Sequence, residues 1–149
     1  MLPSGRRLAI DYGEVRVGTA LSDVSGILAS PYKTFPTADA INQLAELAVS
    51  EDIAVVYLGL PLNLSGAAGQ ATEKAVHFGT QLRAALNSRV LIHLIDERLS
   101  TKSAAQKMAN LGEVVGKNKI DQLAAAEILE FALQIEKSQG ELAGRELQN

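Results

Sequence analysis

The sequence predicts an α/β fold in which helices flank a mixed sheet of five strands. Three β-like segments follow one another near the N-terminus, over residues 7–11, 16–22 and 27–35. Two continuous apolar runs, 53–58 and 90–95, then alternate with stretches of helical periodicity. Strands joined by short turns pair antiparallel, whereas strands separated by helices pair parallel. We therefore expect a three-stranded antiparallel meander continued by two parallel strands.

The first three strands are connected by short turns. Residues 7–11 end on Asp11, and the next strand begins after a tight turn, which is the spacing of a β-hairpin. Pro31 lies within the third segment. Because proline cannot donate a backbone hydrogen bond, it places this strand at an edge or a bend of the sheet.

The second half of the chain alternates strands with helices. The apolar runs are typical of strands buried on both faces, and we expect 53–58 to lie beside the first strand and 90–95 beside 53–58. Helices are expected over residues 38–51, 67–86, 101–111 and 118–137.

Length and composition exclude several classes of protein. A chain of 149 residues is typical of one domain, which we place at residues 1–137, followed by a disordered polar tail at 138–149. The absence of cysteine excludes disulfides and cysteine-based zinc sites. No apolar run approaches the ~18 residues of a membrane span, and the N-terminus lacks a secretory signal. We expect a soluble cytoplasmic protein without a membrane partner.

Acidic residues recur where predicted strands end. Asp11 ends the first strand, Asp96 and Glu97 end the last one, and Asp121 opens the last helix. Sites in α/β sheets form at the carboxyl ends of strands, where carboxylates this close together need a cation between them. Hard oxygen ligands without cysteine indicate Mg²⁺ or Mn²⁺, and two such ions can activate a water for phosphodiester hydrolysis.

Each acid alone also has a structural interpretation. Asp11 could begin a turn, Asp96 could cap a helix, and Asp121 could lie in the first helical turn after an Asn118 cap. However, Asp121 continues at helical spacing into the apolar residues Ala125, Ile128, Ala132 and Ile135, so it faces the sheet, where a buried acid needs a partner. The joint placement of the acids favours a metal site.

The charge of the chain gives a mixed indication about nucleic acid. The formal net charge is −3, which argues against a broadly basic binding surface. A local basic stretch nevertheless runs from Arg98 to Lys119, with Glu113 as its one acid, and contains Lys102, Lys107 and Lys117. By itself such a diffuse cluster is typical of a solvated helix face.

Four motifs in order resemble the YqgF/RuvX family. Residues 11–18, Asp-Tyr-Gly-Glu-Val-Arg-Val-Gly, resemble its first motif, Asp-x-Gly-x-Lys-Arg-(Ile/Val)-Gly. Gly-Leu-Pro-Leu-Asn at 59–63 is similar to its glycine loop, and Asp-Glu-Arg-Leu-Ser-Thr at 96–101 to its Asp-Glu-Arg motif. Lys-Ile-Asp-Gln-Leu-Ala-Ala-Ala at 119–126 resembles its closing helix. Val15 departs from the family pattern, because many relatives carry lysine there.

The resemblance implies a ribonuclease H-like fold and a cytoplasmic, metal-dependent endonuclease. Members are described as nucleases that mature the 5′ end of pre-16S ribosomal RNA and as Holliday junction resolvases. It implies catalytic carboxylates at Asp11, Asp121 and one or both of Asp96 and Glu97, with Asp11, Glu97 and Asp121 holding two Mg²⁺ or Mn²⁺ ions. Alternation along the last strand puts positions 96 and 97 on opposite faces and leaves the choice between them open.

The resemblance also implies a nucleic-acid partner, with precursor rRNA preferred and branched DNA as the alternative. Arg16 and Arg98 match family positions and suit bidentate phosphate contact, and Lys102 and Lys119 lie in the basic stretch. Arg98 could instead form a salt bridge that positions Asp11 or Asp121. Both a monomer and a homodimer are compatible with the sequence, and a junction resolvase would need two active sites.

Two other functions compete with the nuclease. Asp11, Gly13 and Gly18 also resemble the first phosphate loop of actin-like ATPases, but one lobe of this length cannot enclose a nucleotide. An RNA-binding assembly factor without catalysis is the second, and retention of every expected carboxylate argues against it.

Overall fold

A computed structural model describes residues 2–61, 69–96 and 102–148, with 102–115 and 117 described as backbone only. Its centre is a six-stranded mixed sheet in the order β3-β2-β1-β4-β5-β6. The strands are β1 (Arg6–Asp11), β2 (Arg16–Ser22), β3 (Ala29–Pro36), β4 (Ile53–Leu60), β5 (Leu91–Asp96) and β6 (Arg145–Glu146). β1 pairs antiparallel with β2 and β2 with β3, whereas β1, β4 and β5 run parallel.

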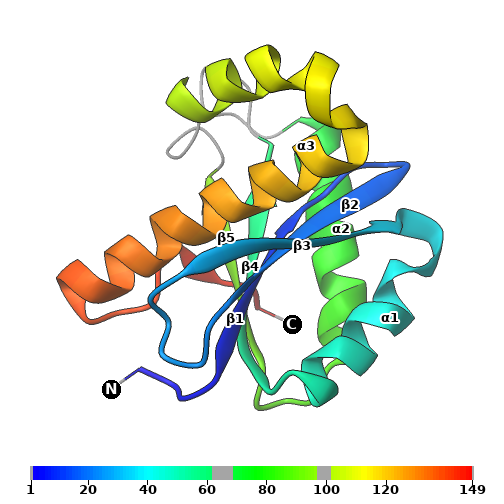
Figure 1. The fold of residues 1–149 in the computed structure, drawn as a ribbon. Coiled ribbons are helices and arrows are strands. Elements are labelled where there is room, and N and C mark those ends of the chain that lie inside the picture. The colour runs from blue at the N-terminus through cyan, green and yellow to red at the C-terminus, as the bar shows by residue number, and fades with distance from the viewer. Residues whose placement is uncertain (1, 62–68, 97–101, 149) are drawn as a thin grey trace.

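Helices cover both faces of the sheet. α1 (Thr37–Ser50) and α2 (Gln70–Ala85) lie on one side, and α3 (Lys102–Gln139) crosses the other (Figure 1). Each parallel connection therefore carries a helix, as a parallel pair requires. Within the described part of the chain, no helix is both long and apolar enough to cross a membrane.

Side-chain alternation in the strands divides the core into two layers. Leu8 and Ile10 of β1 belong to the layer beneath α1 and α2, whereas Ala9 belongs to the layer beneath α3. On the α3 side, the helix contributes Ala125, Ile128, Leu129, Ala132 and Leu133. Small side chains on facing strands let α3 approach the sheet closely, which matters for the site below.

The predicted α/β class, strand order and meander are confirmed. Pro31 lies in β3, which is an edge strand of the sheet. The last two predicted helices are both present, as two helical segments of α3 that meet at Gly116, whose φ of 78° and ψ of 168° are not helical. Helical backbone continues on both sides of this glycine, so the loop expected between them is reduced to a kink.

The expectation of a disordered tail at 138–149 is wrong for the described residues. β6 pairs antiparallel with β5 and adds a sixth strand that the sequence did not predict. Ala143 is 1% exposed, and the carbonyl oxygen of Ala143 lies 2.8 Å from Nδ1 of His93. The tail contributes to both core layers, with Ala143 beneath α3 and Leu147 beneath α1 and α2. These apolar residues are too widely spaced to form a periodic pattern in the sequence.

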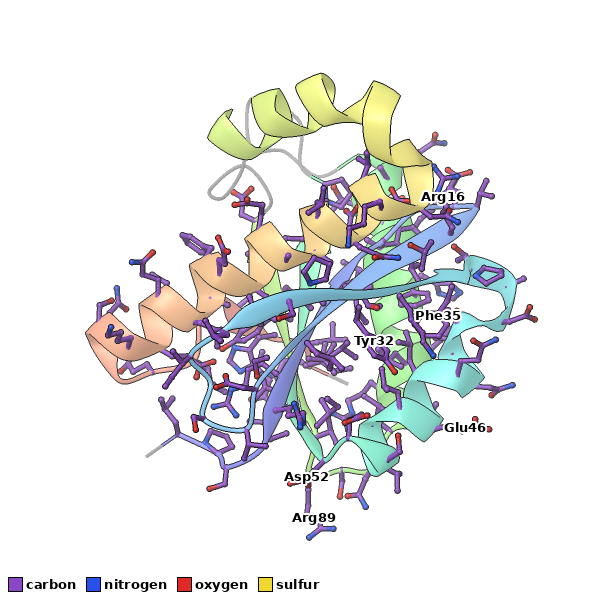
Figure 2. The ribbon with its side chains drawn as sticks, viewed as in Figure 1. Arg16, Tyr32, Phe35, Glu46, Asp52 and Arg89 are labelled. Carbon is purple, nitrogen blue, oxygen red and sulfur yellow. The ribbon has the colours of Figure 1, made fainter. Side chains whose placement is uncertain are left out.

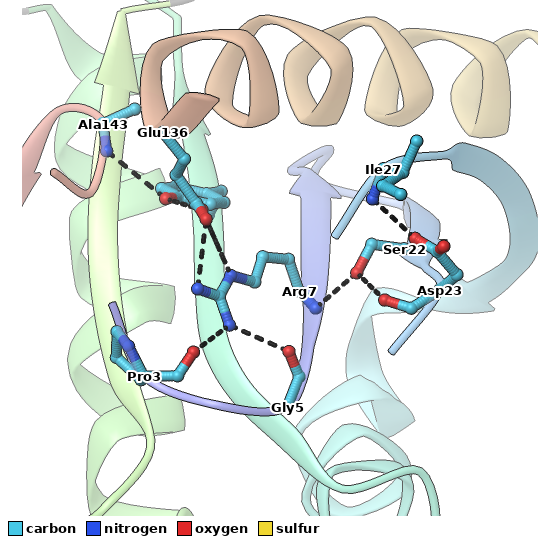
Figure 3. A network of polar contacts seen from close by, with 9 residues as sticks. Pro3, Gly5, Arg7, Ser22, Asp23, Ile27, Glu136 and Ala143 are labelled. Atoms are coloured by element: carbon cyan, nitrogen blue, oxygen red, sulfur yellow. Dashed lines mark hydrogen bonds and ion pairs between the residues drawn. The ribbon is translucent and has the colours of Figure 1, made fainter. Parts of the chain in front are cut away.

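A buried ion pair attaches the C-terminal half of α3 to the start of β1 (Figure 3). Arg7, 4% exposed, donates from Nε and Nη2 to the carboxylate of Glu136, at 3.0–3.2 Å. The remaining guanidinium nitrogen donates to the carbonyl oxygens of Pro3 and Gly5. Tyr57 of β4 donates to Glu136 at 2.5 Å. The network orients α3 across the sheet from the end opposite to Asp11.

Candidate active site

Asp11 ends β1 at the carboxyl edge of the sheet, between two glycines of neighbouring strands. The register pairs Asp11 with Gly18 of β2 and with Gly59 of β4. Because Ala9 faces α3, alternation places Asp11, two residues later, on the same face. The Asp11 side chain is half-buried, so it is reachable from solvent at this edge.

Gly18 brings Asp121 of α3 to the same position. A Cβ atom at Gly18 would lie 2.2 Å from the carbonyl oxygen of Asp121 and 2.6 Å from its Cβ. Only glycine therefore allows α3 to pack here. Since Gly18 is the cross-strand partner of Asp11, its contact with Asp121 brings the two acids together on one face of the sheet.

The sheet-facing stripe of α3 points Asp121 inward, as its helical spacing predicted. Ala125 and Ala132 on this stripe are fully buried, and Ile128 is 1% exposed. Asp121 itself is half-buried at the end of the stripe. Its carboxylate therefore lies at the boundary between the core and the open edge of the sheet.

Arg16 of β2 forms an ion pair with Asp121. Its Nε donates to Oδ2 of the carboxylate, and the two side chains are 33% and 21% exposed. Figure 2 shows Arg16 at the end of the hairpin, close to the bend of α3. Arg16, which we predicted to bind phosphate, thus contacts a predicted metal-binding acid, whereas the sequence had suggested Arg98 for such a salt bridge.

The register assigns Asp96 to the other face. Ile92 and Leu94 belong to the layer beneath α1 and α2, whereas Ile95 belongs to the α3 layer. Alternation therefore gives position 96 to the α1 and α2 side, at the same edge as Asp11. Glu97 and Arg98 lie outside the described residues, as does the side chain of Lys102. Lys119 is exposed on α3, two residues before Asp121.

The described residues bring together two of the predicted acids. Among them, no group of three or more His, Cys, Asp or Glu side chains is close enough to hold a metal ion. Asp11 and Asp121 provide hard oxygen donors on one face, and the guanidinium on Asp121 shows that this carboxylate accepts a cation partner. The pair fits Mg²⁺ or Mn²⁺ as part of a ligand set that needs further oxygen donors.

Sequence reasoning missed the structural part of Gly18. The residue closes the first motif, but its effect depends on a contact with a helix more than a hundred residues later. The turn between β1 and β2 is also stabilised by a residue distant in the sequence. Thr37 donates from Oγ1 to the carbonyl oxygen of Gly13 and from its amide to the carbonyl oxygen of Val15. The available signal was the position of Gly18 inside a predicted strand, where glycine often marks the close approach of another backbone.

Comparison with known proteins gives consistent matches along the chain. A family described as RuvX, Holliday junction resolvase, matches residues 5–135. A protein of Clavibacter sepedonicus named "Putative pre-16S rRNA nuclease" is 40% identical over 146 residues, covering 94% of this chain and 89% of the relative. A protein of the same name from Streptomyces avermitilis is 39% identical, covering 94% and 92%.

Solved structures show the same fold at low sequence identity. Thermus thermophilus RuvC in complex with a Holliday junction substrate superposes with a TM-score of 0.59 at 10% identity, covering 96% of this chain and 99% of RuvC. A second structure of Thermus thermophilus RuvC gives a TM-score of 0.54 at 11% identity, covering 87% and 96%. The predicted ribonuclease H-like architecture is confirmed, with six strands in place of five.

Proposed function

The chain belongs to the RuvX family, and on this premise we propose that it is a metal-dependent endonuclease that matures the 5′ end of pre-16S ribosomal RNA. The observation that supports this most directly is the approach of Asp121 to Asp11 through Gly18. A structural acid needs no such arrangement, whereas metal-assisted hydrolysis of a phosphodiester needs carboxylates gathered at one point to hold the ions. We expect the reaction to take place in the cytoplasm.

Asp11, Glu97 and Asp121 would hold the metal ions, and Asp96 would act at the same edge. Bound Mg²⁺ or Mn²⁺, in one or two sites, supplies a nucleophilic water and charge stabilisation at the leaving oxygen. The chain itself contributes rigidity: β1 and β2 fix Asp11 in register, and close packing at Gly18 fixes Asp121. Such fixed carboxylates need little reorganisation during the reaction.

Four basic residues would bind the RNA backbone: Arg16, Arg98, Lys102 and Lys119. Arginine suits phosphate because its planar guanidinium makes two parallel hydrogen bonds. Arg16 lies next to the acids, so it would contact the phosphate closest to the cleaved bond. Lys119 is exposed and would act at longer range.

The test compares the wild-type protein with Asp11→Asn in the presence of Mn²⁺. Both are given a labelled pre-16S 5′ fragment, and Asp39→Asn in α1 serves as control for the loss of one exposed carboxylate. We expect wild type and Asp39→Asn to cut the RNA, and Asp11→Asn to bind it without cutting. Equal cleavage by wild type and Asp11→Asn would overturn the proposed site.

A Holliday junction resolvase is the second candidate, because the description of the matching family names this activity. A four-way DNA junction belongs in the same experiment. Cleavage of the junction alone would assign the chain to recombination. Binding without metal-dependent cleavage of either substrate would leave an RNA-binding assembly factor.

A further inference from the structure

A hollow of about 300 Å³ lies beside the carboxyl edge of the sheet, on the side of α2. Its described lining consists of Tyr12, Gln70, Glu73, Lys74 and His77. Tyr12 directly follows Asp11, but the two side chains face opposite sides of the sheet, since Tyr12 packs against the layer beneath α1 and α2. A nucleic-acid strand bound at Asp11 can therefore reach the hollow by passing over the carboxyl edge of the sheet.

The ring of Tyr12 is held in place from below. Its centroid lies 5.2 Å from that of Phe78 in α2, with the two planes tilted by 47°. Phe78 is 4% exposed and belongs to the core, whereas Tyr12 is half-buried. An aromatic side chain fixed in this way offers a stacking surface without loss of rotamer freedom on binding.

The polar groups around the ring suit a base better than a phosphate. Lys74 donates to Glu14 at 2.6 Å, and this hydrogen bond raises the pKa of Lys74, so the lysine stays protonated. Glu73 adds a second carboxylate, so these three residues together carry a net negative charge. A phosphate would be repelled, whereas the N–H groups on the edge of a base can donate to a carboxylate or to the amide oxygen of Gln70.

We propose that this hollow binds one unpaired nucleobase of the substrate strand, stacked on Tyr12, close to the bond that is cut. The inference rests on the proposed nuclease function and names a contact for it. The volume is at the lower limit of ligand sites, roughly 300–1,000 Å³, and fits a single planar heterocycle. RNA-binding proteins commonly recognise single strands by stacking splayed bases on aromatic side chains.

The experiment measures binding, not cleavage, with labelled RNA of the pre-16S 5′ region in which one nucleotide at a time is abasic. Fluorescence anisotropy without added metal is recorded for wild type and Tyr12→Leu, which keeps apolar contact with Phe78. We expect one abasic position to weaken wild-type binding on the order of tenfold. Tyr12→Leu should show a similar loss with intact RNA and no further loss at that position.

Two control variants separate stacking from other effects. Tyr32→Leu in β3 removes an aromatic ring elsewhere and should keep the full abasic effect. Tyr12→Phe keeps the ring without the hydroxyl and should bind as wild type does. If the abasic nucleotide and Tyr12→Leu each weaken RNA binding, and the two together weaken it by the product of the two factors, the two act independently. That result would overturn the base site, even if the protein cleaves RNA. If the second change causes no further loss of RNA affinity but the protein does not cleave RNA, the nuclease function would be overturned and the base site retained.

Discussion

Arg16 at the start of β2 and Asp121 in α3 form an ion pair between residues 105 positions apart in the sequence. The pair places a fixed positive charge on a carboxylate that we propose as a metal ligand. A guanidinium and a divalent cation repel one another, so Arg16 should weaken metal binding as long as it remains on Asp121. When a phosphate is present, the same guanidinium has an alternative partner.

Arg16→Gln should therefore raise the affinity of the RNA-free protein for Mn²⁺ and lower its affinity for RNA. We expect the metal dissociation constant to fall by roughly three- to tenfold, because both side chains are partly exposed and water screens the repulsion. Isothermal titration calorimetry measures the metal affinity, and anisotropy measures RNA binding.

Arg6→Gln is the matched control for this change. Arg6 begins β1 at the far end of the strand and pairs with Glu51 at 3.7 Å, at similar exposure. The Arg6→Gln substitution removes one positive charge at a distance from the candidate site, so the Mn²⁺ affinity should not change. A weaker metal affinity in Arg16→Gln would mean that Arg16 orients Asp121 for the metal.

Gly18→Ala should displace α3 from the sheet. The added methyl group would approach the carbonyl carbon of Asp121 to 2.3 Å, and backbone atoms cannot move aside as a flexible side chain does. We expect a loss of about 1–3 kcal/mol in the free energy of unfolding, together with loss of cleavage. Urea denaturation measures the first effect, and the RNA assay measures the second.

Gly69→Ala provides the comparison for a glycine in open space. A Cβ at Gly69 would meet no atom of the described residues within 4 Å, and the φ of −129° at this position is open to any residue. We expect a change of less than about 0.5 kcal/mol. If Gly18→Ala were tolerated as well as Gly69→Ala, the close approach of Asp121 would not be required.

Local patterns were enough to predict the part of the site that lies on regular elements. Asp11 follows an apolar strand, and Asp121 shares a helical stripe with Ala125, so each position could be inferred from residues within a few turns. Asp96 shows the limit of this reasoning. Its position at a strand end was evident, but its face depends on which side Ile95 packs, and that is decided by the tertiary fold.

The sixth strand and the buried ion pair could not be predicted in this way. β6 has two residues, too few for an alternation pattern to be visible. Arg7 and Glu136 are separated by 129 residues, and each alone is typical of a solvated charge. Only the tertiary fold shows that both side chains are buried, and a buried charge is stable only when it is paired.

Glu136→Ala should be among the most destabilising single substitutions in the chain. It leaves the buried guanidinium of Arg7 without its carboxylate and removes the acceptor of the Tyr57 hydroxyl. Breaking a buried pair from one side typically costs about 3–5 kcal/mol. Urea denaturation near pH 7 measures the loss.

The double variant Arg7→Met, Glu136→Leu tests whether the cost comes from the unpaired charge. Apolar replacement of both partners should recover much of the stability lost in Glu136→Ala. Glu51→Ala, which breaks the exposed pair with Arg6, should cost no more than about 1 kcal/mol. A similar small loss for Glu136→Ala would show that the Arg7 network does not hold α3 in place.

Tyr57 should make the folded protein sensitive to alkaline pH. Burial and the hydrogen bond to Glu136 raise the pKa of Tyr57 well above its ordinary value of about 10. The folded state thus keeps a proton that the unfolded chain releases. The stabilisation is complete below pH ~10 and is lost as the pH rises towards the folded-state pKa, by up to about 1.4 kcal/mol per pH unit.

Tyr57→Phe isolates this contribution, because phenylalanine keeps the ring and has no proton to release. Urea denaturation between pH 9 and about 11.5 should show the stability of wild type falling more steeply than that of the variant. Phenolate absorbance should show one tyrosine of the folded wild type that resists ionisation at alkaline pH. This resistant tyrosine should be missing in Tyr57→Phe. Parallel slopes in the two proteins would mean that the Tyr57 hydroxyl is not held by Glu136, and the network would then consist of Arg7, Glu136 and the carbonyl oxygens of Pro3 and Gly5.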